Sequence, residues 1–244
     1  MNIKTKQVYN LLKTYNFASA KQSKSVIVLF AGPSTAANAS KIIEYAKKEG
    51  SIIIGSNYSY KALGIKSDYT YVANDFKLAE NEKLIKNDII VPGKIFSGEK
   101  TPEETAKHLS NHIKRGYHVF MAGGRKFPTT YTVRDYVVMR KDGFLPYSRF
   151  SSAGHGSMIM GAVCRPKKML IVGLDGPTDA SCKEKIMFDG RIQAYNKPQK
   201  NENFKNHFIH VVLPSMKRFR IKLETFKDVN MYGLNKPELG FKIL

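Results

Sequence analysis

Short runs of β-branched and apolar residues alternate along the chain with longer stretches in which apolar positions have helical spacing. Runs such as Ser-Ile-Ile-Ile and Met-Leu-Ile-Val are apolar on both faces, which is typical of interior strands of a parallel sheet. The pattern therefore predicts an α/β fold with a mostly parallel, Rossmann-like sheet and helices on both faces. The predicted strands are Val26–Phe30, Ser51–Gly55, Tyr69–Ala73, Asp88–Val91, Tyr117–Ala122, Met169–Leu174 and Arg220–Phe226.

Turn and cap residues mark where the predicted helices begin and end. A Gly-Pro-Ser-Thr turn at residues 32–35 follows the first strand directly, and an Ala-rich helix then runs to Lys48 and ends at Gly50. A second helix is predicted from Thr101 to Gly116. Its start has a Thr that can cap, a Pro at the first helical position and a Glu that completes a capping box. The chain thus opens with a strand, a tight turn, a helix and a strand.

The pattern predicts one domain preceded by a helix. Residues 1–24 have the spacing of a basic amphipathic helix, which either packs on the domain or lies on a membrane surface. Residues 25–244 are predicted to form a single Rossmann-like domain. Within it, the stretch at about 176–206 has weak periodicity and many lysines. We predict a lid loop there, because loops of this length inside compact domains are usually functional.

Composition and charge narrow the range of partners. With 244 residues, 42% of them hydrophobic, the chain can bury one sizeable core. Lys and Arg number 40 against 20 Asp and Glu, and a net charge of +20 attracts polyanions such as nucleic acid, anionic lipid headgroups or nucleotides. The two cysteines exclude a disulfide-stapled fold and a four-cysteine zinc module, and they favour a reducing compartment.

The sequence also bears on localisation. No apolar run approaches the roughly 20 residues that a membrane helix needs. The first residues are not followed by the apolar region of a secretory signal. We therefore expect a cytoplasmic protein whose membrane contact would be peripheral, at the inner face of an anionic membrane.

Polar and glycine residues follow the first three predicted strands, where ligands collect in an open parallel sheet. After the first strand, Gly32 permits close backbone approach, and the helix that begins with Pro33 and Ser34 offers N–H groups to a phosphate. Asn57 and Asn74 follow the second and third strands. Their amides can hydrogen-bond a sugar or a base, although asparagine is also a common turn residue.

A second candidate phosphate site precedes the predicted strand Met169–Leu174. Arg149 lies beside a turn that contains Ser151, Ser152 and Gly154 and that opens a small-residue helix. Backbone N–H groups and a guanidinium in this arrangement can cradle a phosphate. Asp175, at the end of the following strand, either holds a ribose hydroxyl or caps the loop.

The order of these motifs resembles a known group of enzymes. Ala-Gly-Pro-Ser follows the first strand, Ser-Asn-Tyr the second and Ala-Asn-Asp the third, and Arg-Phe-Ser-Ser-Ala-Gly and Ile-Val-Gly-Leu-Asp come later. Together they resemble the bacterial sialyltransferases of glycosyltransferase family 42 and, more loosely, the MAF-type flagellin glycosyltransferases. The resemblance spans roughly residues 26–226. The chain departs from the family in having Phe-Ala-Gly-Pro-Ser where Gly-Asn-Gly-Pro-Ser is favoured.

The resemblance implies a GT-A-type nucleotide-sugar-binding domain with a lid. It implies an inverting transfer of an acidic, sialic-acid-like sugar from a CMP-activated donor to a glycan acceptor, as in lipopolysaccharide or capsule biosynthesis. It further implies no essential metal or cofactor, the CMP-sugar being a substrate. The residues carried over to the donor are Gly32, Pro33, Ser34, Asn57, Asn74, Arg149, Ser151, Ser152, Gly154 and Asp175.

The catalytic base remains open among three histidines. The family places a histidine on the segment after the lid, where this chain has His207 and His210. His155, between two glycines in the predicted phosphate loop, is a third candidate. A histidine suits this task because its pKa lies near neutral pH.

Two other functions remain open from the sequence. An MptE-like nucleotide-dependent diphosphokinase would use Asp75 and Asp175 to hold Mg²⁺. A basic nucleic-acid-binding module would fit the charge, but the lysines are spread along the chain and no RNP, KH or zinc-finger signature is present, so no specific nucleic acid is expected. His108 and His112 have the spacing of zinc ligands without the glutamate of a His-Glu-x-x-His motif, so no metal site is expected.

Overall fold

The computed structural model describes residues 22–57, 59, 64, 67–73, 75–92, 102–122, 153–176, 184–186, 192–194 and 204–244. Nearly all of the predicted N-terminal helix and most of the predicted lid lie outside these ranges. Among the described residues, no helix combines the length and the apolar character needed to cross a membrane.

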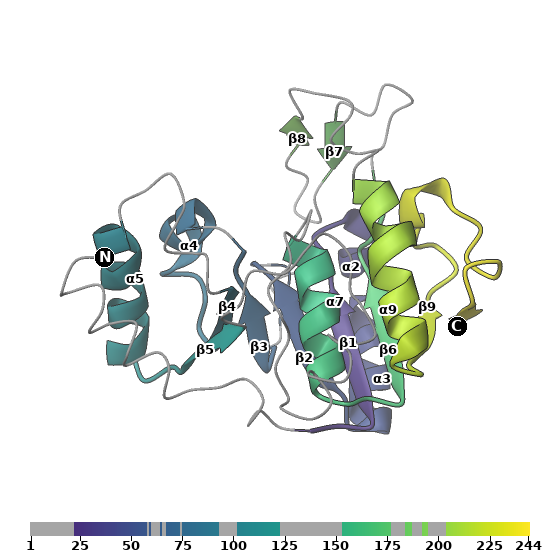
Figure 1. Ribbon diagram of the computed structural model, residues 1–244, viewed down its shortest axis with the longest axis horizontal. Helices are drawn as coiled ribbons and strands as arrows, with labels where there is room; N and C mark the ends of the chain where they lie inside the picture. Colours follow the sequence, from purple (N-terminus) through teal and green to yellow (C-terminus); the bar gives the residue numbers. More distant parts are fainter. Residues whose placement is uncertain are drawn as a thin grey trace.

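The fold is built on one eight-stranded parallel sheet with the strand order β10-β9-β6-β1-β2-β3-β4-β5 (Figure 1). Every neighbouring pair in this sheet is parallel. The predicted α/β, Rossmann-like class is therefore confirmed. The strands are β1 (Ser25–Leu29), β2 (Ile52–Ser56), β3 (Tyr69–Tyr71), β4 (Asp88–Pro92), β5 (Val119–Ala122), β6 (Lys168–Val172), β9 (Lys222–Thr225) and β10 (Phe241–Ile243).

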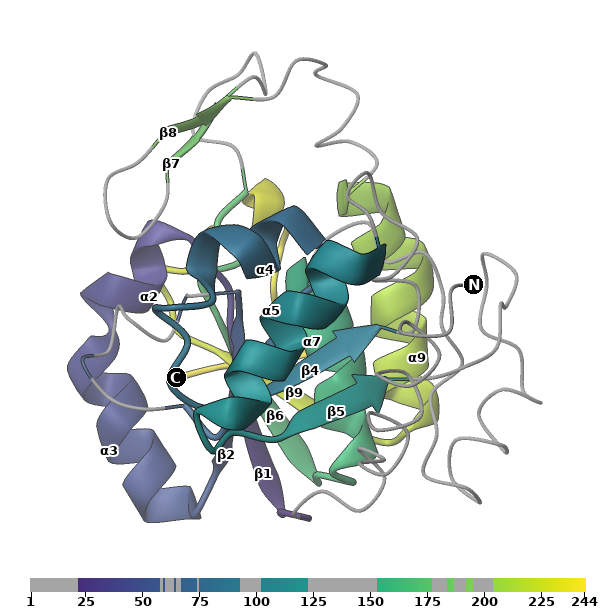
Figure 2. The same cartoon turned by 90° about the vertical axis from the view of Figure 1, so that its left-hand side faces the viewer.

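Helices cover both faces of the sheet. The connections from β1 to β5 step in one direction along the sheet and those from β5 to β9 step in the other. Because parallel crossovers are right-handed, the two groups of helices lie on opposite faces. Figure 2 shows α3 on one side and α7 and α9 on the other. The helices are α2 (Pro33–Ala37), α3 (Ala39–Glu49), α4 (Asp75–Asn81), α5 (Pro102–Lys114), α7 (Ala153–Val163) and α9 (Leu213–Arg218).

The Ala-rich helix predicted to run to Lys48 is two helices. Asn38, between α2 and α3, has φ −105° and ψ 16°, outside the helical region. Its side-chain amide donates to the Ser34 carbonyl and to Asp228, at 2.8 and 2.7 Å. Asparagine readily forms such local bonds, which compete with helix continuation. Gly50 ends α3 in a left-handed conformation, as predicted.

Three strands were not predicted. The predicted lid contains a two-stranded antiparallel ribbon, β7 (Glu184–Ile186) with β8 (Ile192–Ala194), and Figure 1 shows this ribbon standing apart from the large sheet. At the C-terminus, β10 pairs with β9 and forms an edge of the sheet. The predicted strand Arg220–Phe226 begins only at Lys222, because Arg220 has a left-handed φ of 57°.

The strand order creates one topological switch point. β1 lies between β2 and β6, and the chain leaves β1 toward β2 but leaves β6 toward β9. The loops after β1 and β6 therefore part from one another at the carboxyl edge of the sheet, where open α/β sheets form their ligand crevice. β1 is completely buried, so the loop that follows it starts from the centre of the core.

Candidate active site

The loops after β1 and β6 are bonded directly to each other. The Gly32 N–H donates to the Gly173 carbonyl at 3.0 Å, and the Gly173 N–H donates to the Ser34 hydroxyl at 3.1 Å. The Ser34 N–H donates to Asp175 Oδ2 at 2.8 Å. A Cβ atom on Gly32 would overlap both Asp175 Oδ2 and the Gly173 carbonyl oxygen, so only glycine fits there.

These contacts bear on the predicted phosphate site at residues 32–34. The N–H groups of Gly32 and Ser34 have protein acceptors, and the Thr35 N–H donates to the Gly32 carbonyl at 3.1 Å. Pro33 has no N–H to offer. A phosphate at this turn would have to displace the Asp175 carboxylate. Donor binding by Gly32, Pro33 and Ser34 stays a prediction, and the contacts seen here join the two loops.

Asp175 has the loop-capping role that the sequence left as one of two alternatives. Its Oδ2 atom accepts from Ser34, and its Oδ1 atom accepts from the Asn230 N–H at 3.3 Å. The residue is buried. Both oxygens therefore hold backbone N–H groups of the protein.

The first turn of α7 packs against the ends of β1 and β3. A Cβ atom on Gly154 would overlap the Phe30 ring, and one on Gly156 would overlap the Tyr71 ring. The two glycines allow the helix backbone to approach the sheet closely. His155, between them, is completely buried, and the Phe30 ring meets it edge-on with centroids 6.1 Å apart.

His155 and His207 form a pair at this edge. Their Nδ1 atoms lie 3.2 Å apart, and their rings stack with centroids 5.3 Å apart and planes inclined by 16°. In a hydrogen bond between them, one Nδ1 carries the proton and the other accepts it. Burial lowers the pKa of His207 below its usual value, which favours the neutral imidazole that a general base requires.

A distorted turn of helix positions His207. Residues 204–218 form a helical run whose middle, η4 (Phe208–Val212), is a π-helix that continues into α9. Single π-turns inside helices occur frequently at functional sites. Phe208, the residue after His207, is buried and stacks on His155 with ring centroids 5.6 Å apart.

Tyr232 is a third member of this cluster, and the sequence analysis missed it. It lies in the short 3₁₀ helix η5 (Met231–Gly233), and its hydroxyl is 3.5 Å from His155 Nε2. Met231 and Tyr232 have left-handed φ angles of 50° and 60°. Such backbone strain in residues with side chains tends to cluster at functional sites. The Asn-Met-Tyr-Gly sequence signals a turn, but not its contact with α7.

Asn57 is the predicted donor residue after β2, and its N–H donates to the Tyr71 carbonyl at 2.9 Å. It follows β2 with a left-handed φ of 56°, and its Oδ1 atom is buried without a hydrogen-bond partner among the described residues. The preceding residue, Ser56, contacts Ser157 of α7 through hydroxyls 3.0 Å apart. An unmatched buried acceptor on a strained backbone is expected where a ligand supplies the missing donor.

Five further predicted residues are not placed in this cluster by the described residues, and their roles stay predictions. His210 is exposed, whereas His155 is buried. Asn74, Arg149, Ser151 and Ser152 lie outside the described residues.

The described residues contain no cluster of three or more potential metal ligands. His108 contacts Glu82, and His112 contacts the Asn87 carbonyl at 2.8 Å. Each of these histidines therefore has a protein partner within the packing around α5.

The fold and this edge define a Rossmann-like α/β protein with a histidine cluster at its switch point. No protein-family model matches the sequence, and no curated protein matches it. A solved structure similar to the chain is that of the MAf glycosyltransferase from Magnetospirillum magneticum AMB-1, with 14% sequence identity and a TM-score of 0.48. The match covers 85% of this chain and 32% of that one, so the chain spans about a third of the neighbour's length.

Proposed function

We propose that the chain is an inverting glycosyltransferase that moves an acidic, sialic-acid-like sugar from a CMP-activated donor to a glycan acceptor. The observation that carries the proposal is the contact of the buried His155 with the half-buried His207 at the carboxyl edge of the sheet. The motifs that resemble family 42 sialyltransferases supply the donor class.

The pair supports a division of roles between the two histidines. His155 is completely buried, whereas His207 is half-buried, so His207 is the one that can reach a substrate. Because its Nδ1 atom faces His155, its Nε2 atom is left for the acceptor. His207 is then the catalytic base and His155 the positioning residue.

The proposed transfer forms one bond, breaks one bond and moves one proton. The acceptor hydroxyl oxygen attacks the anomeric carbon from the face opposite to the phosphate. The bond between that carbon and the phosphate oxygen breaks, and CMP leaves with the electron pair. The hydroxyl proton passes to His207 Nε2, and the His207 Nδ1–H donates to His155 Nδ1, which stabilises the resulting imidazolium.

The N-terminus of α7 supports the donor side of the proposal. The first N–H groups of an α-helix have no acceptor within the helix, and the helix dipole favours an anion there. In α7 these groups include those of Gly154 and His155, next to the proposed base. The net charge of +20 also raises the local concentration of an anionic donor.

The first test measures CMP binding by titration calorimetry and then CMP release from CMP-N-acetylneuraminic acid with a panel of acceptor glycans. His207→Ala should lower turnover by about 10²- to 10⁴-fold, the usual contribution of a general base. His210→Ala is the matched control, because His210 lies on the same helical run but is exposed, and it should keep wild-type turnover.

Three results would count against the proposal. No heat of binding at millimolar CMP would contradict the proposed donor. Equal losses of turnover in His207→Ala and His210→Ala would contradict the assignment of the catalytic base to His207. Turnover of Mg²⁺-ATP without CMP binding would favour the diphosphokinase alternative.

A further inference from the structure

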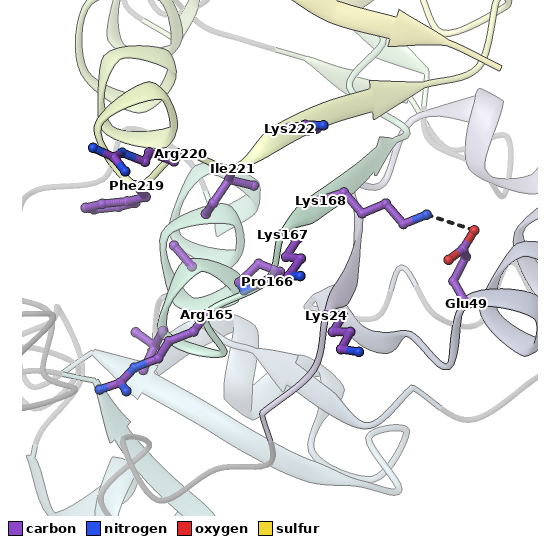
Figure 3. Close-up of a pocket in the computed structure, with 12 residues that line it drawn as sticks. Lys24, Glu49, Arg165, Pro166, Lys167, Lys168, Phe219, Arg220, Ile221 and Lys222 are labelled. Carbon is purple, nitrogen blue, oxygen red and sulfur yellow. Dashed lines mark ion pairs between the residues drawn. The ribbon is translucent and has the colours of Figure 1, made fainter.

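A cationic cavity lies at the opposite edge of the sheet. It has a volume of about 690 Å³ and opens where Lys24 precedes β1, Lys168 begins β6 and Lys222 begins β9. Because the strands are parallel, this amino edge is remote from the His155–His207 pair, which lies at the carboxyl edge. Figure 3 shows the lining side chains spread around the opening.

The rim of the cavity carries a large excess of positive charge. Among the described residues that line it, the one carboxylate is Glu49, which pairs with Lys168 at 2.8 Å. The remaining lining cations are exposed: Lys24, Arg165, Lys167, Arg220 and Lys222. Cations that line one cavity repel one another, and a bound anion would lower that repulsion.

Two of these cations occupy positions where glycine would be easier to accommodate. Arg165 follows α7 and Arg220 follows α9, with left-handed φ angles of 53° and 57°. Their N–H groups donate back to the preceding helical turn, both at 3.0 Å. Residues with a Cβ atom are strained in this conformation, which is why helices usually end there on glycine.

The same chain uses glycine at two equivalent positions. Gly50 after α3 and Gly116 after α5 have φ angles of 58° and 86°, and their N–H groups donate back to the Ala46 and Ile113 carbonyls. The cavity therefore has arginine at both of its helix ends despite the backbone cost. A role for the two side chains would offset this cost.

The floor of the cavity is apolar. Ala162, Val163 and Ile221 are buried, and Phe219 is half-buried beside them. The volume lies within the range of small-ligand pockets, which favours a headgroup-sized ligand over an extended nucleic-acid strand. Arginine and lysine together bind phosphate groups well, through charged and forked hydrogen bonds.

We propose that this cavity is a second ligand site that binds a headgroup carrying more than one phosphate charge, either free or attached to a lipid. Phosphates would contact Arg165, Arg220 and the rim lysines, and the organic part would lie over Ile221 and Phe219. The site is independent of the proposed sugar transfer, because it uses none of the residues at the carboxyl edge.

The test compares the wild type with an Arg165→Gly/Arg220→Gly double variant. Pyrophosphate is titrated by calorimetry at about 150 mM salt, where purely diffuse attraction is weak. The double variant should bind at least about tenfold more weakly, since each contact to a charged group contributes substantially. Its thermal midpoint should equal or exceed that of the wild type, because glycine adopts the left-handed conformation without strain.

A Lys83→Gln/Lys86→Gln double variant is the control. It removes the same charge from exposed positions after α4, outside the cavity lining, and should keep the wild-type affinity. Pyrophosphate affinity that is unchanged in the arginine variant, or that falls equally in both variants, would overturn the proposal.

Two further measurements distinguish the sources of the phosphate. Sedimentation with cardiolipin vesicles, whose headgroup carries two phosphate charges, but not with phosphatidylcholine vesicles, lost in the arginine variant, would indicate a lipid-borne headgroup. Pyrophosphate binding without vesicle binding would indicate a free ligand. An oligonucleotide that binds through the two arginines when pyrophosphate does not would replace the proposal with a nucleic-acid site, and no binding of any probe would also overturn it.

Discussion

Asp175 bonds to Ser34 across the switch point: its Oδ2 atom accepts the Ser34 N–H at 2.8 Å, between residues 141 positions apart in the sequence. The same carboxylate accepts the Asn230 N–H at 3.3 Å. One buried side chain thus joins the loop after β1, the loop after β6 and the segment that leads to Tyr232.

Asp175→Ala should lower the free energy of unfolding. The variant leaves the buried Ser34 N–H without its acceptor, which costs about 1–3 kcal/mol. Asp175→Asn keeps one acceptor oxygen and should lose less. Urea unfolding measures both differences, and an alanine variant as stable as the wild type would contradict this account.

Gly154→Ala should destabilise the protein although alanine has the higher helix propensity. Its Cβ atom would overlap the Phe30 ring, and overpacking of this kind typically costs about 1–3 kcal/mol. Gly161→Ala, in the same helix, is the control. Its Cβ atom would lie 2.9 Å from the flexible end of Met169 and 3.1 Å from Val26, so it should cost less. Thermal unfolding of the two variants should rank them in that order.

Acid should weaken the packing around His112. Burial lowers the pKa of this histidine, and its Nδ1 atom has no hydrogen-bond partner among the described residues. The unfolded chain therefore binds a proton more tightly, so stability falls as the pH drops below the unfolded value of about 6.5.

The measurement is the free energy of unfolding between about pH 5 and 7. Replacing His112 with Gln should reduce the slope of the unfolding free energy against pH. The reduction is at most about 1.4 kcal/mol per pH unit, the value for the uptake of one proton. His118→Gln is the control, because His118 is exposed and pairs with Asp88 at the surface. His207 has a similarly lowered pKa, so some slope should remain in the His112 variant. An unchanged slope would show that His112 does not take part.

Tyr232→Phe tests the cluster beyond the two histidines. The variant removes the hydroxyl near His155 Nε2 and should lower kcat by roughly threefold to tenfold, the range for one neutral hydrogen bond. The KM for the donor should stay unchanged, because the hydroxyl acts through His155. Tyr45→Phe is the control, since that hydroxyl contacts Glu224 instead. Equal kcat values for the wild type and Tyr232→Phe would remove Tyr232 from the catalytic cluster.

The sequence predicted the fold well where the signal is local. The apolar run that forms β1 is recognisable within five residues, and Gly50 marks the end of α3. The break at Asn38 was missed because it depends on a bond to Asp228, 190 residues away. β10 was missed because its three residues, Phe-Lys-Ile, form a strand only by pairing with β9.

The candidate site was predicted only in part, for the same reason. His155 and His207 were both singled out by their residue type, but their pairing joins positions 52 residues apart. His210 has the same local signal as His207 and is exposed. No local sequence pattern indicated a role for Tyr232. Its position depends on packing against Gly176, which is 56 residues away in the sequence.

The π-turn at Phe208–Val212 sets the direction in which His207 faces. Such a turn has one more residue than an ordinary helical turn, and each helical residue rotates the chain by about 100°. Removing one residue from it would restore a regular helix while swinging the preceding segment about a quarter of the way around the axis. A chain one residue shorter at this point would keep the buried face of α9 but lose the contact between His207 and His155. The extra residue of the π-turn therefore determines whether the two imidazoles meet.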